Sequence, residues 1–143
     1  MDSDGQMRID SLEAAWPNRH EYDLLLGYRV KRADGPYRCM MGRVGNSVSN
    51  MLLGRNITDI NCGFKLFKKD LIHSLTLTST GSSINFEILR LIFRNNPSLR
   101  MLQFPVIHYP RIAGRNTGGD PKVLYKLIAE GVKILFFPKK TDL

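Results

Sequence analysis

Two aspartates one residue apart, Asp2 and Asp4, are the side chains whose type and spacing most directly suggest chemistry. The carboxamide of Gln6 follows two residues later. Hard oxygen donors of this kind suit Mg²⁺ or Mn²⁺, which keep several waters and take one or two carboxylates together with substrate phosphates. A cation held in this way can bridge a diphosphate and stabilise a phosphate leaving group. The sequence therefore predicts a divalent metal site at Asp2, Asp4 and Gln6.

Two other interpretations fit the same segment. Asp10 and Glu13 have the spacing of a helix-capping pair, so the acidic residues could belong to a turn before a helix. Residues 2–13 also look like a calcium loop of the EF-hand type, with acidic or amide groups at loop positions 1, 3, 5, 9 and 12. Met7, however, occupies the position that needs glycine for the sharp turn, and only Met1 stands where a helix is required. The calcium interpretation is therefore disfavoured.

Composition narrows the class of protein. The 143 residues suit one domain, 1–143, and the 21 basic against 13 acidic residues give a net charge of +8. This excess favours an anionic partner, although solubility alone would also explain it. The basic residues are dispersed, without a helix-turn-helix, zinc or RNA-recognition pattern, so we expect no nucleic-acid partner. Cys39 and Cys62 lack a C-x-x-C spacing, which indicates a reduced, cytosolic chain.

The elements that must position these residues alternate between strand and helix patterns. Strands are predicted at 22–28, 64–67 and 99–109, with Pro105 indicating an edge or a bulge. Helices are predicted at 11–16, 37–53, 69–75, 84–94 and 123–137, the first stopped by Pro17 and the second by Gly54. This alternation predicts an α/β fold, a mixed sheet with flanking helices, with 22–28 as the central strand.

Four segments, taken in order, resemble a known family. They are 1–6, 26–29, 59–67 and 108–115, and their order and spacing are similar to the second half of the catalytic domain of family 2 glycosyltransferases. The similar branch contains dolichyl-phosphate mannose synthase and the bacterial polyprenyl-phosphate sugar transferases. Each motif is weak alone, but the four together cover the chain to about residue 137. The resemblance implies a partial GT-A-like fold, that of nucleotide-diphospho-sugar transferases, from which the N-terminal strands are missing.

This resemblance implies a function. We expect metal-dependent transfer of a sugar from a nucleotide-diphosphate donor to a polyprenyl phosphate or related lipid-phosphate acceptor at a membrane surface, by a fragment of a longer enzyme. The alternatives are an inactive fragment or a basic nucleic-acid-binding module. The expected location is cytoplasmic, peripheral at the inner face of the membrane. An exposed sheet edge would favour self-association.

The resemblance also assigns roles to single residues. Asp59 is the expected catalytic residue, as a general base or by orienting the donor sugar, and its structural alternative is a turn or cap. Arg29, at a strand end, would help to place a phosphate, because a guanidinium offers paired donors. Glu87 would face the substrate, or else lie on a helix surface. Arg111 and Arg115 would close a glycine-rich loop over a pyrophosphate or lipid phosphate.

Overall fold

The computed structural model describes residues 6–30, 35–73, 75–79 and 83–109, together with Tyr125 and Ala129. The predicted metal ligands Asp2 and Asp4 lie outside these residues. So do the predicted loop residues Arg111 and Arg115 and most of the helix predicted at 123–137. These predictions therefore remain predictions.

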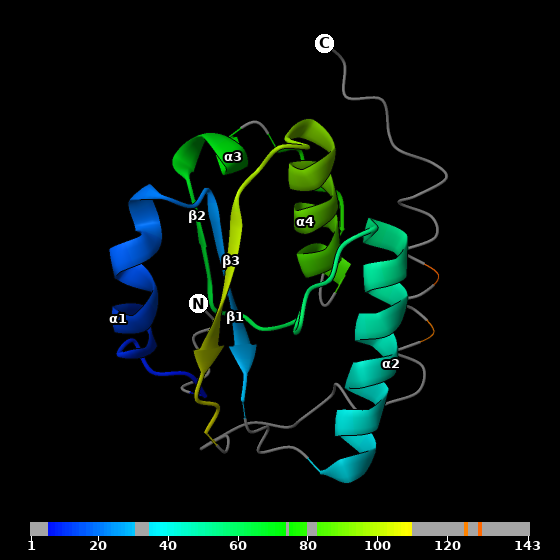
Figure 1. Ribbon diagram of the computed structural model, residues 1–143. Coiled ribbons are helices and arrows are strands. Elements are labelled where there is room, and N and C mark those ends of the chain that lie inside the picture. Colours follow the sequence, from blue (N-terminus) through cyan, green and yellow to red (C-terminus); the bar gives the residue numbers. More distant parts are fainter. Residues whose placement is uncertain are drawn as a thin grey trace.

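A three-stranded mixed sheet forms the centre of the described part (Figure 1). Strand β1 (Leu24–Arg29) lies between β2 (Lys65–Phe67) and β3 (Met101–Val106). β1 pairs with β2 in antiparallel fashion and with β3 in parallel fashion. The predicted α/β class, the mixed sheet and the central place of the first strand are thus confirmed, and the arrangement is compatible with part of a glycosyltransferase fold.

The leucines of β1 bury both faces of this sheet. Leu25 packs on one face with Ala15 of helix α1 (Ser11–Ala15). Leu24 and Leu26 pack on the other face with Leu89 of helix α4 (Ile84–Asn95). Successive side chains of a strand point to opposite faces, so a run of three leucines requires cover on both sides. Figure 1 shows this cover, with α1 on one side of the strands and α4 on the other.

The remaining helices follow the predicted order. Helix α2 (Pro36–Leu53) ends at Gly54, whose φ of 62° is left-handed, as expected for a glycine helix stop. Helix α3 (Lys69–His73) is shorter than predicted. Helix α1 ends at Ala15, one residue before the predicted end, and the chain continues through Pro17 as a 3-10 helix, η1 (Trp16–His20), whose early position tolerates proline.

The buried face of α4 also differs from the prediction. In the helix predicted at 84–94, the aliphatic spacing predicts one inner face for Ile88, Leu91 and Ile92, but Ile88 and Leu91 are only half-buried. The buried residues are Phe86, Glu87, Leu89, Ile92 and Phe93. The inner face thus includes two phenylalanines that the aliphatic spacing does not indicate.

The parallel pairing of β1 and β3 determines where a site can form. Arg29 lies opposite Val106, so the carboxyl ends of both strands meet at one edge of the sheet. Ligands of α/β proteins bind outside such carboxyl ends. Gly27 permits the close approach of the segments here, since a Cβ at this position would lie 2.6 Å from Cγ2 of Val106 and 2.8 Å from the carbonyl oxygen of Phe64.

Candidate functional site

Arg29 and Asp59 form a two-pronged ion pair at this edge. Nε and one terminal nitrogen of Arg29 donate to the two carboxylate oxygens of Asp59 at 2.6 and 2.8 Å. The backbone N–H of Arg29 also donates to Oδ2, at 3.4 Å. The side chains are only 8% and 12% exposed. Two candidate residues that the sequence analysis treated separately are therefore one unit, and the guanidinium holds the carboxylate in a fixed direction.

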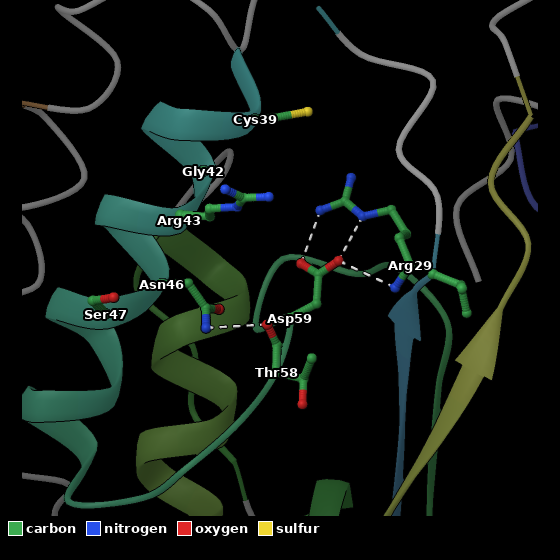
Figure 2. Close-up of a pocket in the computed structure, with 9 residues that line it drawn as sticks. Arg29, Cys39, Gly42, Arg43, Asn46, Ser47, Thr58 and Asp59 are labelled. Atoms are coloured by element: carbon green, nitrogen blue, oxygen red, sulfur yellow. Dashed lines mark hydrogen bonds and ion pairs between the residues drawn. The ribbon is translucent and has the colours of Figure 1, made fainter. Parts of the chain in front are cut away.

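A cleft of about 750 Å³ opens beside this pair (Figure 2). Its opposite wall is the middle of α2, which contributes Cys39, Arg43, Asn46 and Ser47. Figure 2 shows Arg43 and Asn46 on the side of α2 that looks toward Asp59. Arg43 is exposed, so its charge is available to the cleft. The lining thus combines a neutralised ion pair, a further guanidinium, a hydroxyl and an amide, which suits an anionic ligand with polar groups.

Helix α2 holds the loop that carries Asp59. Nδ2 of Asn46 donates to the carbonyl oxygens of Ile57 and Thr58 at 2.7 and 3.2 Å, and its Oδ1 accepts the N–H of Ile60 at 2.8 Å. One turn later, Asn50 exchanges two hydrogen bonds with the backbone of Ile57. Residues four apart lie on one helix face, so both amides meet the same loop.

Strand β3 holds the same loop from the other side. Oε1 of Gln103 accepts the N–H of Thr58 at 2.7 Å, and its Nε2 donates to the carbonyl oxygen of Asn56 at 3.0 Å. Ile57 and Ile60 anchor the loop in the core, where each is only 1% exposed. Side-chain amides thus replace the backbone partners that a helix or strand would supply. We call Asn46, Asn50 and Gln103 the amide clamp.

Glu87 lies elsewhere. It does not line the cleft, and its carboxylate is buried, where it accepts hydrogen bonds from the backbone N–H groups of Thr78 and Ser79 and from the hydroxyl of Thr78. Burial by itself raises the pKa of Glu87, but the hydrogen bonds from Thr78 and Ser79 outweigh it, and the pKa is lowered. The contacts of Glu87 thus hold the 78–79 segment against α4.

Gln6, the last of the predicted metal ligands, lies next to Tyr109, which precedes the predicted arginine loop. Met7 and His108 form an antiparallel bridge, and Tyr109 donates its N–H to the carbonyl oxygen of Gln6 at 2.8 Å. Nε2 of Gln6 donates to the carbonyl oxygen of Tyr109 at 3.2 Å. Because His108 follows β3 by two residues, this bridge lies at the carboxyl edge of the sheet, like Arg29. The described ends of the predicted metal segment and of the predicted arginine loop are therefore adjacent.

Within the described residues, neither a metal-binding cluster nor a cysteine thiol adds a second candidate site. In residues 6–30, 35–73, 75–79 and 83–109 there is no cluster of three histidine, cysteine or acidic side chains that could hold a metal. Cys62 packs in the core with its sulfur 3.8 Å from that of Met7, and burial raises the pKa of its thiol. Likewise, no helix within the part of the chain that the structure describes is long and apolar enough to cross a membrane.

The amide clamp and Arg43 were not predicted from the sequence. Asn46 and Asn50 are four residues apart, so they lie on one helix face. This spacing could have indicated that both amides bind the same segment. Gln103 interrupts a strand whose neighbour on the same face, Met101, packs in the core. A polar residue at such a position calls for a partner. The identity of that partner, the loop before Asp59, depends on tertiary contacts.

Comparison with known proteins identifies a distant relative. Over 126 residues the chain is 27% identical to the glycosyltransferase AglJ of Haloferax volcanii. The match covers 85% of this chain but spans 41% of the length of that relative. No family model matches the chain, and no solved structure is significantly similar to it. The match therefore relates this chain to part of a glycosyltransferase.

Proposed function

We propose that this chain carries part of the active site of a glycosyltransferase that moves a sugar from a nucleotide-diphosphate donor to a polyprenyl phosphate or a related lipid phosphate. One observation carries the proposal: the Arg29–Asp59 pair faces a cleft at the carboxyl edge of parallel strands. The distant relationship to a glycosyltransferase supports it. The four sequence motifs in order support the more specific similarity to family 2.

The reaction assigns distinct tasks to the residues. An oxygen of the acceptor phosphate attacks the anomeric carbon of the sugar. The bond from that carbon to the donor diphosphate breaks, and its electron pair leaves with the nucleoside diphosphate. The acceptor is already anionic, so no proton has to be removed. Asp59, whose two oxygens accept hydrogen bonds from Arg29, therefore suits orientation of the donor sugar better than general-base catalysis.

Charge compensation falls to the cations of the site. In this proposal Arg43 and Ser47, on one face of α2, hold the anionic acceptor group in the cleft. Arg111 and Arg115 contact the donor diphosphate or the lipid phosphate. Asp2, Asp4 and Gln6 would hold Mg²⁺ or Mn²⁺, which would neutralise charge on the leaving diphosphate. A cytoplasmic location at the inner membrane face and self-association through a sheet edge complete the proposal.

The test uses the full-length gene product. Transfer from labelled nucleotide sugars is measured with vesicles that contain a polyprenyl phosphate, with and without Mn²⁺. We expect Arg43→Ala to raise the acceptor KM about tenfold, because a hydrogen bond to a charged group is lost. Arg94→Ala, which removes an exposed guanidinium on α4, is the control for net charge and should leave KM unchanged. Absence of both transfer and nucleoside-diphosphate binding in the parent protein would overturn the proposal.

A further inference from the structure

We propose that Asn46 is a positioning residue for Asp59, and that it links the occupied cleft to the direction of the Asp59 carboxylate. The inference rests on the proposed function for its catalytic meaning. Its structural content, that Asn46 fixes the backbone on both sides of Asp59, can be tested by itself. The inference is based on two hydrogen bonds, which join the amide of Asn46 to both peptide groups that flank Asp59.

The segment from Asn56 to Asn61 has neither helix nor strand. Within it, the carbonyl of Thr58 belongs to the peptide before Asp59, and the N–H of Ile60 belongs to the peptide after it. Asn46 donates to the first at 3.2 Å and accepts from the second at 2.8 Å. The N–H of Cys62 also donates to the carbonyl oxygen of Asp59, in the second of these peptides, at 3.2 Å. Because peptide groups are planar, hydrogen bonds from Asn46 to both of them restrict φ and ψ of Asp59, and with them its Cα–Cβ direction.

The other members of the amide clamp act further away. Asn50 binds only Ile57, whose peptide groups do not adjoin Asp59. Gln103 binds the N–H of Thr58 and the carbonyl of Asn56, which also lie before that point. Asn50 and Gln103 therefore secure the loop, whereas Asn46 sets the residue that the loop presents.

Asn46 is also the clamp residue that lines the cleft together with Arg29 and Asp59, while Asn50 and Gln103 do not line it. A ligand that contacts this wall of α2 therefore meets the same residue that bonds the Asp59 peptides. Contact of a ligand with this wall would therefore affect the Asp59 carboxylate through one side chain, Asn46. Three hydrogen bonds fix the rotamer of that side chain.

The Nε–H of Arg29 reports on this geometry without any substrate. It donates to Oδ2 of Asp59 at 2.6 Å, so its exchange with solvent slows when the carboxylate is in place. The experiment compares this exchange by NMR in Asn46→Ala and in Asn50→Ala, a matched change of the same residue type on the same helix. We expect exchange to be about tenfold faster in Asn46→Ala than in Asn50→Ala, a factor that corresponds to the net free energy of about one hydrogen bond.

Equal exchange rates in the two variants would overturn the inference, because Asn46 would then only secure the loop. If Asn46→Ala does not fold, Asn46→Asp replaces it. This variant keeps the size and the acceptor for Ile60 but cannot donate to Thr58 when ionised. Faster Arg29 exchange in Asn46→Asp supports the inference, and an unchanged rate overturns it.

The transferase assay on the full-length protein supplies the second readout. Asn46→Ala should lower kcat about tenfold or more while the donor KM stays within about twofold, the pattern of an interaction that matters in the transition state. In Asn50→Ala the decrease in kcat should be smaller. A KM effect without a kcat effect would overturn the catalytic meaning. If the parent protein transfers no sugar at all, the proposed function fails, and the exchange experiment still decides whether Asn46 positions Asp59.

Discussion

Arg29 and Asp59 hold opposite charges against each other with little access to water, since their side chains are 8% and 12% exposed. Removal of charges from water is costly, and mutual attraction repays the cost only when the geometry is good. The two-pronged contact meets that condition. At the scale of the residue, loss of one partner should therefore lower the free energy of unfolding more than loss of both.

Arg29→Met should destabilise the protein by about 3–5 kcal/mol, because it leaves the carboxylate of Asp59 buried without its partner. The double variant Arg29→Met/Asp59→Leu should cost less than this single change, since no charge remains unpaired. Urea denaturation of all variants, followed by circular dichroism, measures the free energies of unfolding. Additive costs in the double variant would contradict the assignment of a coupled pair.

Glu87 gives a pH-dependent prediction. Its pKa in the folded protein is lowered, so its contribution to stability is present above the ordinary value of 4.5 and is lost as the pH falls through the lower folded value. Glu87→Gln should therefore destabilise the protein at pH 7, by about 1–3 kcal/mol for lost hydrogen bonds to a charged group. The difference from the parent should shrink toward pH 3. Urea midpoints across this range test it.

Asp70→Asn is the control for Glu87, since it changes an exposed carboxylate at the start of α3. At pH 7 this variant should destabilise the protein less than Glu87→Gln, because its carboxylate is exposed to solvent. A loss for Glu87→Gln that stays constant from pH 7 to pH 3 would show that the hydrogen bonds of Glu87 do not depend on its charge.

At the scale of the element, local patterns in the sequence were enough to predict most of the fold. The leucine run at 24–26 predicted a buried central strand, and the proline and glycine at the ends of 36–54 predicted α2. The 3-10 helix at Trp16–His20 was not predicted, and the inner face of α4 was predicted wrongly, because the aliphatic spacing does not indicate the buried phenylalanines. Arg29 and Asp59 were identified singly, whereas their pairing across 30 residues was not, because it depends on tertiary contacts.

Gly27 gives the prediction that belongs to β1. A methyl group there would meet Val106 at 2.6 Å and the Phe64 carbonyl at 2.8 Å, both closer than normal contacts. Since the carbonyl is backbone, Gly27→Ala should separate the strand from its neighbours and destabilise the protein by about 1–3 kcal/mol. Thermal unfolding measures the loss.

Gly35→Ala provides the matched control for Gly27→Ala, because nothing lies within 4 Å of a Cβ at position 35. It should cost less than about 1 kcal/mol, the value of a weaker helix cap. Equal losses in the two variants would mean that chain flexibility, and not the close approach to Val106, makes glycine necessary at 27.

At the scale of the whole molecule, the two ends of the sheet have different tasks. At the amino end of β1, Asp23 accepts hydrogen bonds from Nζ of Lys68 at 2.5 Å and from the N–H of Arg100 at 2.9 Å. These contacts join the end of β2 and the start of β3 to β1. At the carboxyl end, the loop with Asp59 and the wall with Arg43 form the cleft. Stability at one edge and chemistry at the other should therefore be separable.

Asp23→Asn and Arg43→Ala test this separation. The hydrogen bond from Lys68, followed by that from Arg100, lowers the pKa of Asp23, so its contribution is present above pH 3.8 and is lost as the pH falls through the lower folded value. Since Lys68 is 44% exposed, we expect Asp23→Asn to cost only about 1 kcal/mol at pH 7, and less near pH 3.

Calorimetric binding of a short-chain polyprenyl phosphate should be unchanged by Asp23→Asn. In Arg43→Ala that binding should weaken while the free energy of unfolding stays constant. Equal weakening of binding by the two substitutions would show that both edges serve one site.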